Sequence, residues 1–323
     1  MQAEPDVHWS QTQLLLPAAT ALPGAADAGA LALCQCQPRT PGQGGAAALA
    51  QIVVAPAMGV PQGYYQAFAQ WLAEQGFGVT TFDYRGSGLS RQGPLRQARA
   101  DLLDWAQDCQ RVAAHLQQQF PGQPLIWIGH SVGAQLPGLS PVPLPLNGLL
   151  SVGSGSGYWR DNAPPTRRMV RLFWWGVAPL VTAACGGFPG RSLGIIGDLP
   201  AGVLWQWRRW CLHPDYAMGV EGAWAANAYA AARYPLHALS FEDDEMMSLA
   251  STQSLVGWYR NAPSLLERVS PALSPSGRIG HMGFFRATMR ETLWPPLLPL
   301  LAQWRQGLRS PGKPLFGPPE SPA

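Results

Sequence analysis

One serine of the chain stands in a pattern that suits nucleophilic chemistry. Ser131 is the centre of residues 129–133, Gly-His-Ser-Val-Gly, which match the pattern G-x-S-x-G. Glycines at these positions allow a tight turn from a strand into a helix, with the serine exposed above a sheet. The apolar residues 125–128 come directly before this turn, which favours a nucleophile over a structural serine in a glycine-rich loop.

A serine hydroxyl is a poor nucleophile at neutral pH, so the site also needs a base within hydrogen-bond reach. Of the six histidines, His281 is the best candidate, because residues 279–283 follow the last expected strand and precede the final helix. His130 adjoins Ser131, but its side chain should point away from the hydroxyl and serve in packing. The remaining histidines lack a comparable setting: His8, His115, His213 and His237.

A carboxylate that orients the base is expected after the penultimate strand, which gives the chain order Ser, Asp, His. Residues 241–245 read Phe-Glu-Asp-Asp-Glu and place four carboxylates in a row there. Side chains of a strand alternate between its faces, but a loop is free to turn, so alternation does not choose between Asp243 and Asp244. The other interpretation is a solvated acidic loop with no role beside His281.

Two backbone N–H groups that stabilise an oxyanion are expected, one from the residue after the nucleophile and one from the loop after the first central strand. Val132 supplies the first, and Met58, within residues 56–60, is our choice for the second. Pro56 and Ala57 stand where a His-Gly pair is usual. A loop that only closes the strand is therefore the alternative.

The elements needed to position these residues alternate along the chain. Short buried strands that alternate with helices predict a mostly parallel central sheet with helices on both faces. Strands are predicted at residues 30–37, 51–55, 78–82, 125–128, 149–152, 235–241 and 268–271, and helices at 63–75, 96–120, 248–259 and 286–305.

The alternation breaks at residues 157–234, where apolar and aromatic residues crowd together without short buried strands. We interpret this range as an inserted helical lid on a core made of residues 30–156 and 235–308. Residues 1–29 are predicted to be an N-terminal extension. Residues 309–323 are predicted to be a proline-rich disordered tail.

Seven of the fourteen tryptophans fall in the predicted lid. Packing in a core would explain any one of them. Their concentration over the expected mouth of the site predicts an apolar and aromatic surface for a substrate. The four that we assign to substrate binding are Trp159, Trp174, Trp175 and Trp207.

Charge patterning bears on the classes of partner. The formal net charge is +3 and the 22 Lys and Arg residues are scattered, so no patch suited to nucleic acid is predicted. An uncharged, largely apolar run, residues 172–190, carries two prolines and four glycines. This composition favours a buried or interfacial lid segment over a membrane span, and it leaves a loose membrane contact open.

The five cysteines are odd in number and show no C-x-x-C spacing, and the first residues lack the basic and apolar regions of a secretory signal. We therefore expect reduced thiols in a cytoplasmic protein. The sequence contains no metal motif, phosphate loop or dinucleotide fingerprint, so no metal or other cofactor is predicted.

The order of these elements resembles the α/β-hydrolase superfamily, and specifically its branch of serine aminopeptidase-like and monoacylglycerol lipase-like hydrolases. The resemblance extends from Gln51 to Trp304. Residues 82–90, Phe-Asp-Tyr-Arg-Gly-Ser-Gly-Leu-Ser, look like the loop after the fourth strand in that branch, where the Asp and Arg are structural. Residues 153–159 and 280–286 look like segments of a bacterial group of predicted hydrolases, which implies no particular substrate.

In the families that the chain resembles, the acid is followed by one variable residue and then an apolar one. Asp244 fits this pattern and Asp243 does not, so the resemblance implies a triad of Ser131, Asp244 and His281. The expected reaction is hydrolysis of an ester or related acyl bond of a hydrophobic small molecule, through an acyl-enzyme on Ser131. Acyl transfer on the same residues and a non-catalytic binding protein of the same fold are the alternatives.

Overall fold

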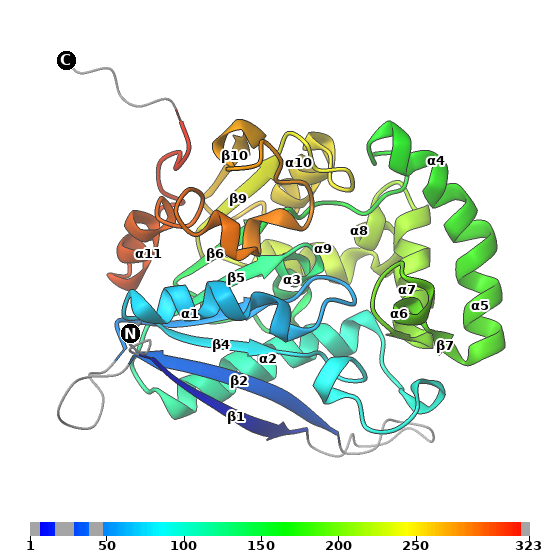
Figure 1. The fold of residues 1–323 in the computed structure, drawn as a ribbon, viewed down its shortest axis with the longest axis horizontal. Helices are drawn as coiled ribbons and strands as arrows, with labels where there is room; N and C mark the ends of the chain where they lie inside the picture. Colours follow the sequence, from blue (N-terminus) through cyan, green and yellow to red (C-terminus); the bar gives the residue numbers. More distant parts are fainter. Residues whose placement is uncertain (1–6, 17–28, 39–47, 318–323) are drawn as a thin grey trace.

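A single eight-stranded sheet organises the chain, whose computed structural model describes residues 7–16, 29–38 and 48–317 (Figure 1). The strand order is β1-β2-β4-β3-β5-β6-β9-β10, and within this sheet only β2 runs against the other strands. The predicted mostly parallel sheet is confirmed. Its strands are β1 (Val7–Leu15), β2 (Ala30–Pro38), β3 (Gln51–Ala55), β4 (Gly78–Phe82), β5 (Leu125–His130), β6 (Gly148–Val152), β9 (Leu236–Phe241) and β10 (Ser264–Val269).

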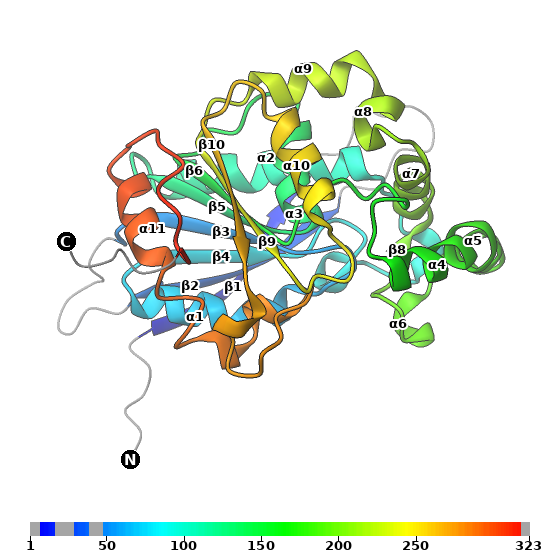
Figure 2. The ribbon, with the colours of Figure 1, turned by 90° about the horizontal axis from the view of Figure 1, so that it is seen from above.

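Helices cover both faces of the sheet because its central strands are apolar on both sides (Figure 2). Along β3, Ile52 and Val54 belong to one buried cluster, and Val53 and Ala55 belong to the other. The first cluster includes side chains of α1 and α11, and the second includes side chains of α2 and α10. These helices are α1 (Gln66–Glu74), α2 (Leu102–Gln119), α10 (Leu249–Trp258) and α11 (Leu297–Arg305).

Two helices begin later than their periodicity predicts. α2 starts after Asp101, whose carboxylate accepts the N–H of Asp104 at 2.9 Å while the Asp104 carboxylate accepts the N–H of Asp101 at 3.0 Å. This reciprocal cap fixes the helix start, so residues 96–100 lie outside the helix. α11 starts after Pro296 and not at Arg286, because a proline interrupts a helix that would continue through it.

The inserted residues 157–234 are mainly helical and lie beside the carboxyl ends of the parallel strands (Figure 1). A two-stranded ribbon that the sequence did not predict, β7 (Gly187–Phe188) with β8 (Leu199–Pro200), ties this segment together. Among the residues that the structure describes, no helix is long and apolar enough to cross a membrane. The inserted helices are α4 (Pro164–Leu172), the π-helix η5 (Phe173–Val177), α5 (Ala178–Cys185), α6 (Gly190–Leu193), α7 (Ala201–Leu212), α8 (Tyr216–Glu221) and α9 (Ala223–Ala231).

The predicted N-terminal extension, residues 1–29, differs from the structure over nine residues. Residues 7–15 form β1, which pairs with the whole of β2 and closes one edge of the sheet. Most side chains of β1 are exposed or half-buried, as expected for an edge strand, so the run lacks the apolar alternation by which strands are recognised. The other residues of the range, apart from Leu16 and Gly29, lie outside the described part of the chain.

The predicted disordered tail, residues 309–323, differs from the structure over residues 309–317, which pack on the sheet, and residues 318–323 lie outside the described part of the chain. The carboxylate of Glu267 on β10 accepts the N–H groups of Leu315 at 2.7 Å and Phe316 at 2.6 Å. His237 on β9 contacts Glu267 through Nε2 at 3.1 Å and the carbonyl of Pro311 through Nδ1 at 2.8 Å. These polar contacts hold in place a segment that its proline-rich composition predicts to be disordered.

We expect Glu267→Gln to lower the free energy of unfolding by about 1–3 kcal/mol at neutral pH, because buried hydrogen bonds to a charge are lost. Burial alone would raise the pKa of Glu267, but its bonds to His237, Leu315 and Phe316 outweigh burial and lower it. The carboxylate therefore stabilises the fold above the unfolded pKa, and this contribution disappears as pH falls through the lowered folded pKa. Urea unfolding at several pH values measures the difference. Glu291→Gln, whose side chain is 86% exposed, is the matched control and should change nothing.

Candidate functional site

Ser131 occupies a strained turn between β5 and the short helix α3 (Val132–Gln135). Its backbone has φ 51° and ψ −120°, a conformation that costs a non-glycine residue free energy. Hydrogen bonds on both sides of the turn hold it there. The N–H of Ser131 donates to the carbonyl of Val152 at 3.0 Å, and the carbonyl of Ser131 accepts the hydroxyl of Ser154 at 2.6 Å.

The two glycines of the G-x-S-x-G pattern are required by close backbone approaches. A Cβ on Gly129 would lie 2.4 Å from the N atom of Ala134, inside the turn itself. A Cβ on Gly133 would lie 2.4 Å from the carbonyl oxygen of Ala55, at the end of β3. The turn can therefore form only without side chains at both positions, and it presses the start of α3 against the loop after β3.

That loop holds Met58, whose N–H and that of Val132 donate to no backbone or side-chain acceptor among the described residues. Both residues are buried. The inserted segment covers the same loop, because a Cβ on Gly197 would lie only 1.9 Å from the carbonyl oxygen of Gly59. Two buried N–H groups without acceptors near a serine could bind a developing negative charge.

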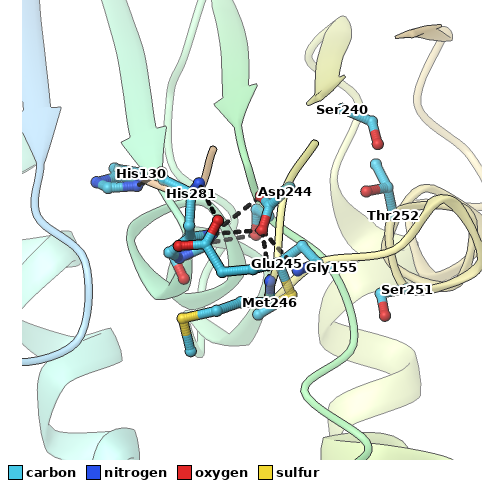
Figure 3. A network of polar contacts seen from close by, with 12 residues as sticks. His130, Gly155, Ser240, Asp244, Glu245, Met246, Ser251, Thr252 and His281 are labelled. Carbon is cyan, nitrogen blue, oxygen red and sulfur yellow. Dashed lines mark hydrogen bonds and ion pairs between the residues drawn. The ribbon is translucent and has the colours of Figure 1, made fainter. Parts of the chain in front are cut away.

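Asp244 and His281 form the closest ion pair of the region (Figure 3). Nδ1 of His281 lies 3.0 Å from Oδ2 and 3.2 Å from Oδ1 of Asp244. The N–H groups of Met246 and Met247 donate to the same carboxylate at 2.8 Å and fix its direction. With Nδ1 engaged, Nε2 of His281 is the nitrogen that remains for a proton from another group.

The two carboxylates that flank Asp244 hold the backbone of the histidine loop. Asp243 accepts the N–H of Ile279 at 2.8 Å, and Glu245 accepts the N–H of His281 at 3.1 Å. Three consecutive acidic residues therefore contact one three-residue stretch. The sequence predicts that the acidic run supplies one carboxylate to His281. The two residues that flank Asp244 also position the loop of residues 279–281, a role that the sequence did not reveal.

His130 has a more specific role than the packing that its sequence position predicted. Its buried ring contacts the hydroxyl of Tyr65 through Nδ1 at 2.8 Å and the carbonyl of His281 through Nε2 at 2.9 Å. The Tyr65 hydroxyl in turn accepts the N–H of Ala57 at 2.8 Å. With Tyr65 donating to Nδ1, the His130 ring carries its proton on Nε2. One chain of hydrogen bonds thus joins the loop of Met58 to the backbone of His281.

Electrostatics separate the two histidines. Burial lowers the pKa of His130 to about 3, aided by the nearby charge of His281, so His130 is neutral at neutral pH. Burial would also lower the pKa of His281, but the charge of Asp244, its hydrogen bond and the charge of Glu245 reverse the direction and raise it. His281 can therefore carry a proton that its neighbour cannot.

The structure brings Ser131 and the Asp244–His281 pair to the same edge of the sheet. Val152 bonds to Ser131, and a Cβ on the next residue, Gly153, would lie 3.4 Å from Oδ2 of Asp244 and 3.7 Å from Nδ1 of His281. No hydrogen bond joins the Ser131 hydroxyl to His281 within the described ranges.

The four tryptophans assigned to substrate binding separate into two pairs. Trp174 is buried and packs edge-on against Trp207, with 4.8 Å between ring centroids, inside the inserted segment. Trp159 and Trp175 are the more accessible pair and line a hollow. Residues 82–90 stay outside the site: Asp83 accepts the N–H groups of Gln62 and Leu89, and Arg85 pairs with Asp108 at 2.7 Å.

Within the described residues, no group of three or more His, Cys, Asp or Glu side chains is arranged to hold a metal ion. The candidate site consists of Ser131, Asp244, His281 and the N–H groups of Met58 and Val132.

Comparison with known proteins places this arrangement in context. The family model described as serine aminopeptidase, S33, matches residues 46–137. A soluble variant of monoglyceride lipase from Saccharomyces cerevisiae, in complex with a substrate analogue, is similar with a TM-score of 0.57 and 15% identity, over 91% of this chain and 98% of that one. An esterase from Pyrococcus furiosus is similar with a TM-score of 0.56 and 11% identity, over 92% of this chain and 91% of that one.

A haloalkane dehalogenase from Bradyrhizobium elkani is as similar, with a TM-score of 0.57 and 14% identity over 93% of this chain and 99% of that one. No curated protein sequence matches the chain. At such low identities the structural likeness concerns the fold, and the choice of reaction depends on the site residues.

We expect the pKa of His281 to fall when Asp244 is replaced by Asn, because the largest influence that raises it is removed. Glu245→Gln should lower it less, and Asp243→Asn, the matched control, should leave it unchanged because Asp243 contacts only the backbone of Ile279. NMR titration of the labelled imidazole rings measures all three. Equal shifts in the Asp243 and Asp244 variants would contradict the pairing.

Proposed function

We propose that this chain, an α/β-hydrolase by its fold, is a serine hydrolase that cleaves an ester or related acyl bond through an acyl-enzyme on Ser131. His281 acts as general base, Asp244 orients it, and the N–H groups of Met58 and Val132 receive the oxyanion. The observation that carries the proposal is the convergence of the strained Ser131 turn with the Asp244–His281 pair at one sheet edge.

The proposed reaction follows from which atoms are free. Nδ1 of His281 is held by Asp244, so Nε2 takes the proton of the Ser131 hydroxyl as Oγ attacks the acyl carbon. Negative charge develops on the acyl oxygen and is stabilised by the unpaired N–H groups of Met58 and Val132. His281 then protonates the leaving group, and a water molecule, activated by the same nitrogen, releases the acid.

A hydrophobic small molecule is the proposed substrate, because the segment over the strand ends is rich in aromatic side chains. Ser131 is only 6% exposed, so the acyl group reacts in a site that excludes most water. All five cysteines are free thiols, which supports the cytoplasm as the proposed compartment.

Ser131→Ala should lower turnover of short p-nitrophenyl esters by about a million-fold, because the triad acts as a unit. The variant should keep the stability of the wild type, since the hydroxyl makes no hydrogen bond within the described residues. A fluorophosphonate probe should label the wild type and not the variant. Ser192→Ala, an exposed serine of the inserted segment, is the control and should be labelled normally. Labelling of the Ser131 variant would remove Ser131 as nucleophile.

Esters of increasing acyl length should be hydrolysed with rising kcat/KM for as long as each added methylene group is buried on binding, because each buried methylene group contributes about 0.8 kcal/mol. Amide substrates with a free amino terminus test the alternative that the family description suggests. Their rates should be far lower than those of esters of matched size, since the carboxylates of Asp243, Asp244 and Glu245 are already bonded to residues 279–281 and are not free to bind an ammonium group. A preference for the charged amino-terminal substrates would reverse the assignment.

A further inference from the structure

A hollow of about 540 Å³ lies in the inserted segment and takes no part in the proposed reaction. It is lined by Trp159, Arg160, Arg171 and Trp175, and by none of the residues proposed for catalysis. Trp159 and Arg160 belong to the loop after β6. Arg171 and Trp175 lie four residues apart on the continuous helix formed by α4 and η5. Two indole rings and two guanidinium groups therefore face one space.

The positive charges of this hollow have no carboxylate partner among the described residues, in contrast to Arg85, Arg91 and Arg290. Arg160 and Arg171 instead approach the same ring, with their central carbons 5.2 Å and 6.0 Å from the centroid of Trp159. Stacking on an indole restrains a guanidinium group while it leaves the N–H donors free. The guanidinium N–H groups of Arg160 and Arg171 are thus restrained in position but have no carboxylate to bind within the described part of the chain.

The helix that supplies Arg171 and Trp175 is locally distorted. Residues 173–177 form a π-helical turn two residues before Pro179, which cannot donate an N–H to the carbonyl of Trp175. This turn buries Trp174 to 2% exposure and leaves Trp175 54% exposed, at 5.5 Å from the ring of Trp159. The distortion therefore places a large apolar side chain outside the core, next to the two arginines.

Apolar residues continue from the hollow along the same helical arm. Met169, Leu172 and Leu180 are each at least 70% exposed, more than most large apolar side chains of the chain. Arg167 and Arg168 are also exposed on α4 and form no ion pair within the described residues. A ligand with a negative head and an apolar chain would satisfy both surfaces, whereas a purely apolar ligand would leave the arginines unused.

We propose that the hollow of Trp159, Arg160, Arg171 and Trp175 is a binding site for the anionic head group of an amphiphile. The phosphate or carboxylate is bound by the two guanidinium groups, and the apolar chain lies against Trp175 and Leu172. Arginine suits this role because its planar fork of donors matches such oxyanions. Binding requires no acyl bond in the ligand and does not depend on Ser131.

The first test uses the full chain with probes that contain no acyl ester. Dodecyl phosphate below its micelle concentration represents the free amphiphile, and isothermal titration measures its binding. Vesicles of ether-linked phosphatidylcholine, with or without an equal part of ether-linked phosphatidylglycerol, represent a lipid surface, and co-sedimentation measures binding to them. Binding to dodecyl phosphate supports a site for free amphiphiles, and binding only to the anionic vesicles assigns the head group to a membrane lipid. Binding to neither probe overturns the proposal.

Variants locate the site. Arg160→Gln with Arg171→Gln should weaken binding of the anionic probe by roughly thirtyfold, which is about fivefold for each charge removed. Arg260→Gln with Arg309→Gln removes the same charge from exposed positions elsewhere and should change binding less than threefold. Equal losses in both pairs would show general attraction to a positive surface and overturn the proposal.

Replacing the two arginines by lysine distinguishes a site that needs guanidinium groups from one that needs only positive charge. Arg160→Lys with Arg171→Lys keeps both charges but not the planar donors, so we expect only partial recovery of affinity relative to the Gln pair. Full recovery would contradict a site that depends on guanidinium geometry. Ester hydrolysis by all these variants, assayed with a short soluble ester, should equal that of the wild type, which keeps this result separate from the test of Ser131.

Discussion

The turn at Ser131 holds a residue with a side chain at positive φ, and the rest of the site depends on the contacts that permit it. Without side chains at Gly129 and Gly133, the backbone of α3 can approach both β5 and the end of β3. The same approach sets the N–H of Val132 beside the loop of Met58. The strain is opposed by hydrogen bonds to Val152 and Ser154, so the neighbouring strand contributes directly to the geometry of Ser131.

The irregular loop that carries His281 also needs hydrogen-bond acceptors for its backbone. Loop N–H groups near a sheet edge need acceptors, and here consecutive carboxylates supply them together with the partner of the imidazole. Concentrating negative charge in this way raises the pKa of His281, while the equally buried His130 stays neutral. The position and the proton affinity of His281 thus have a common origin in one short acidic segment.

The order of strands and helices could be predicted because buried parallel strands are apolar runs and amphipathic helices have a clear period. Ser131 could be singled out because the glycines around it form a local sequence pattern. His281 could be singled out because it lies between the last expected strand and the final helix. β1 and residues 309–317 could not, since both owe their structure to partners far along the chain, β2 and Glu267. The roles of Tyr65 and Glu245 were hidden for the same reason, because a hydrogen bond to a distant backbone leaves no local pattern.

The contact between Gly59 and Gly197 joins the inserted segment to the loop of Met58 backbone against backbone. Such a joint has no side chain that could be exchanged for a smaller or larger one. Any segment that replaced residues 157–234 would therefore also have to bring a bare backbone to this point, because a side chain at Gly197 would collide with Gly59.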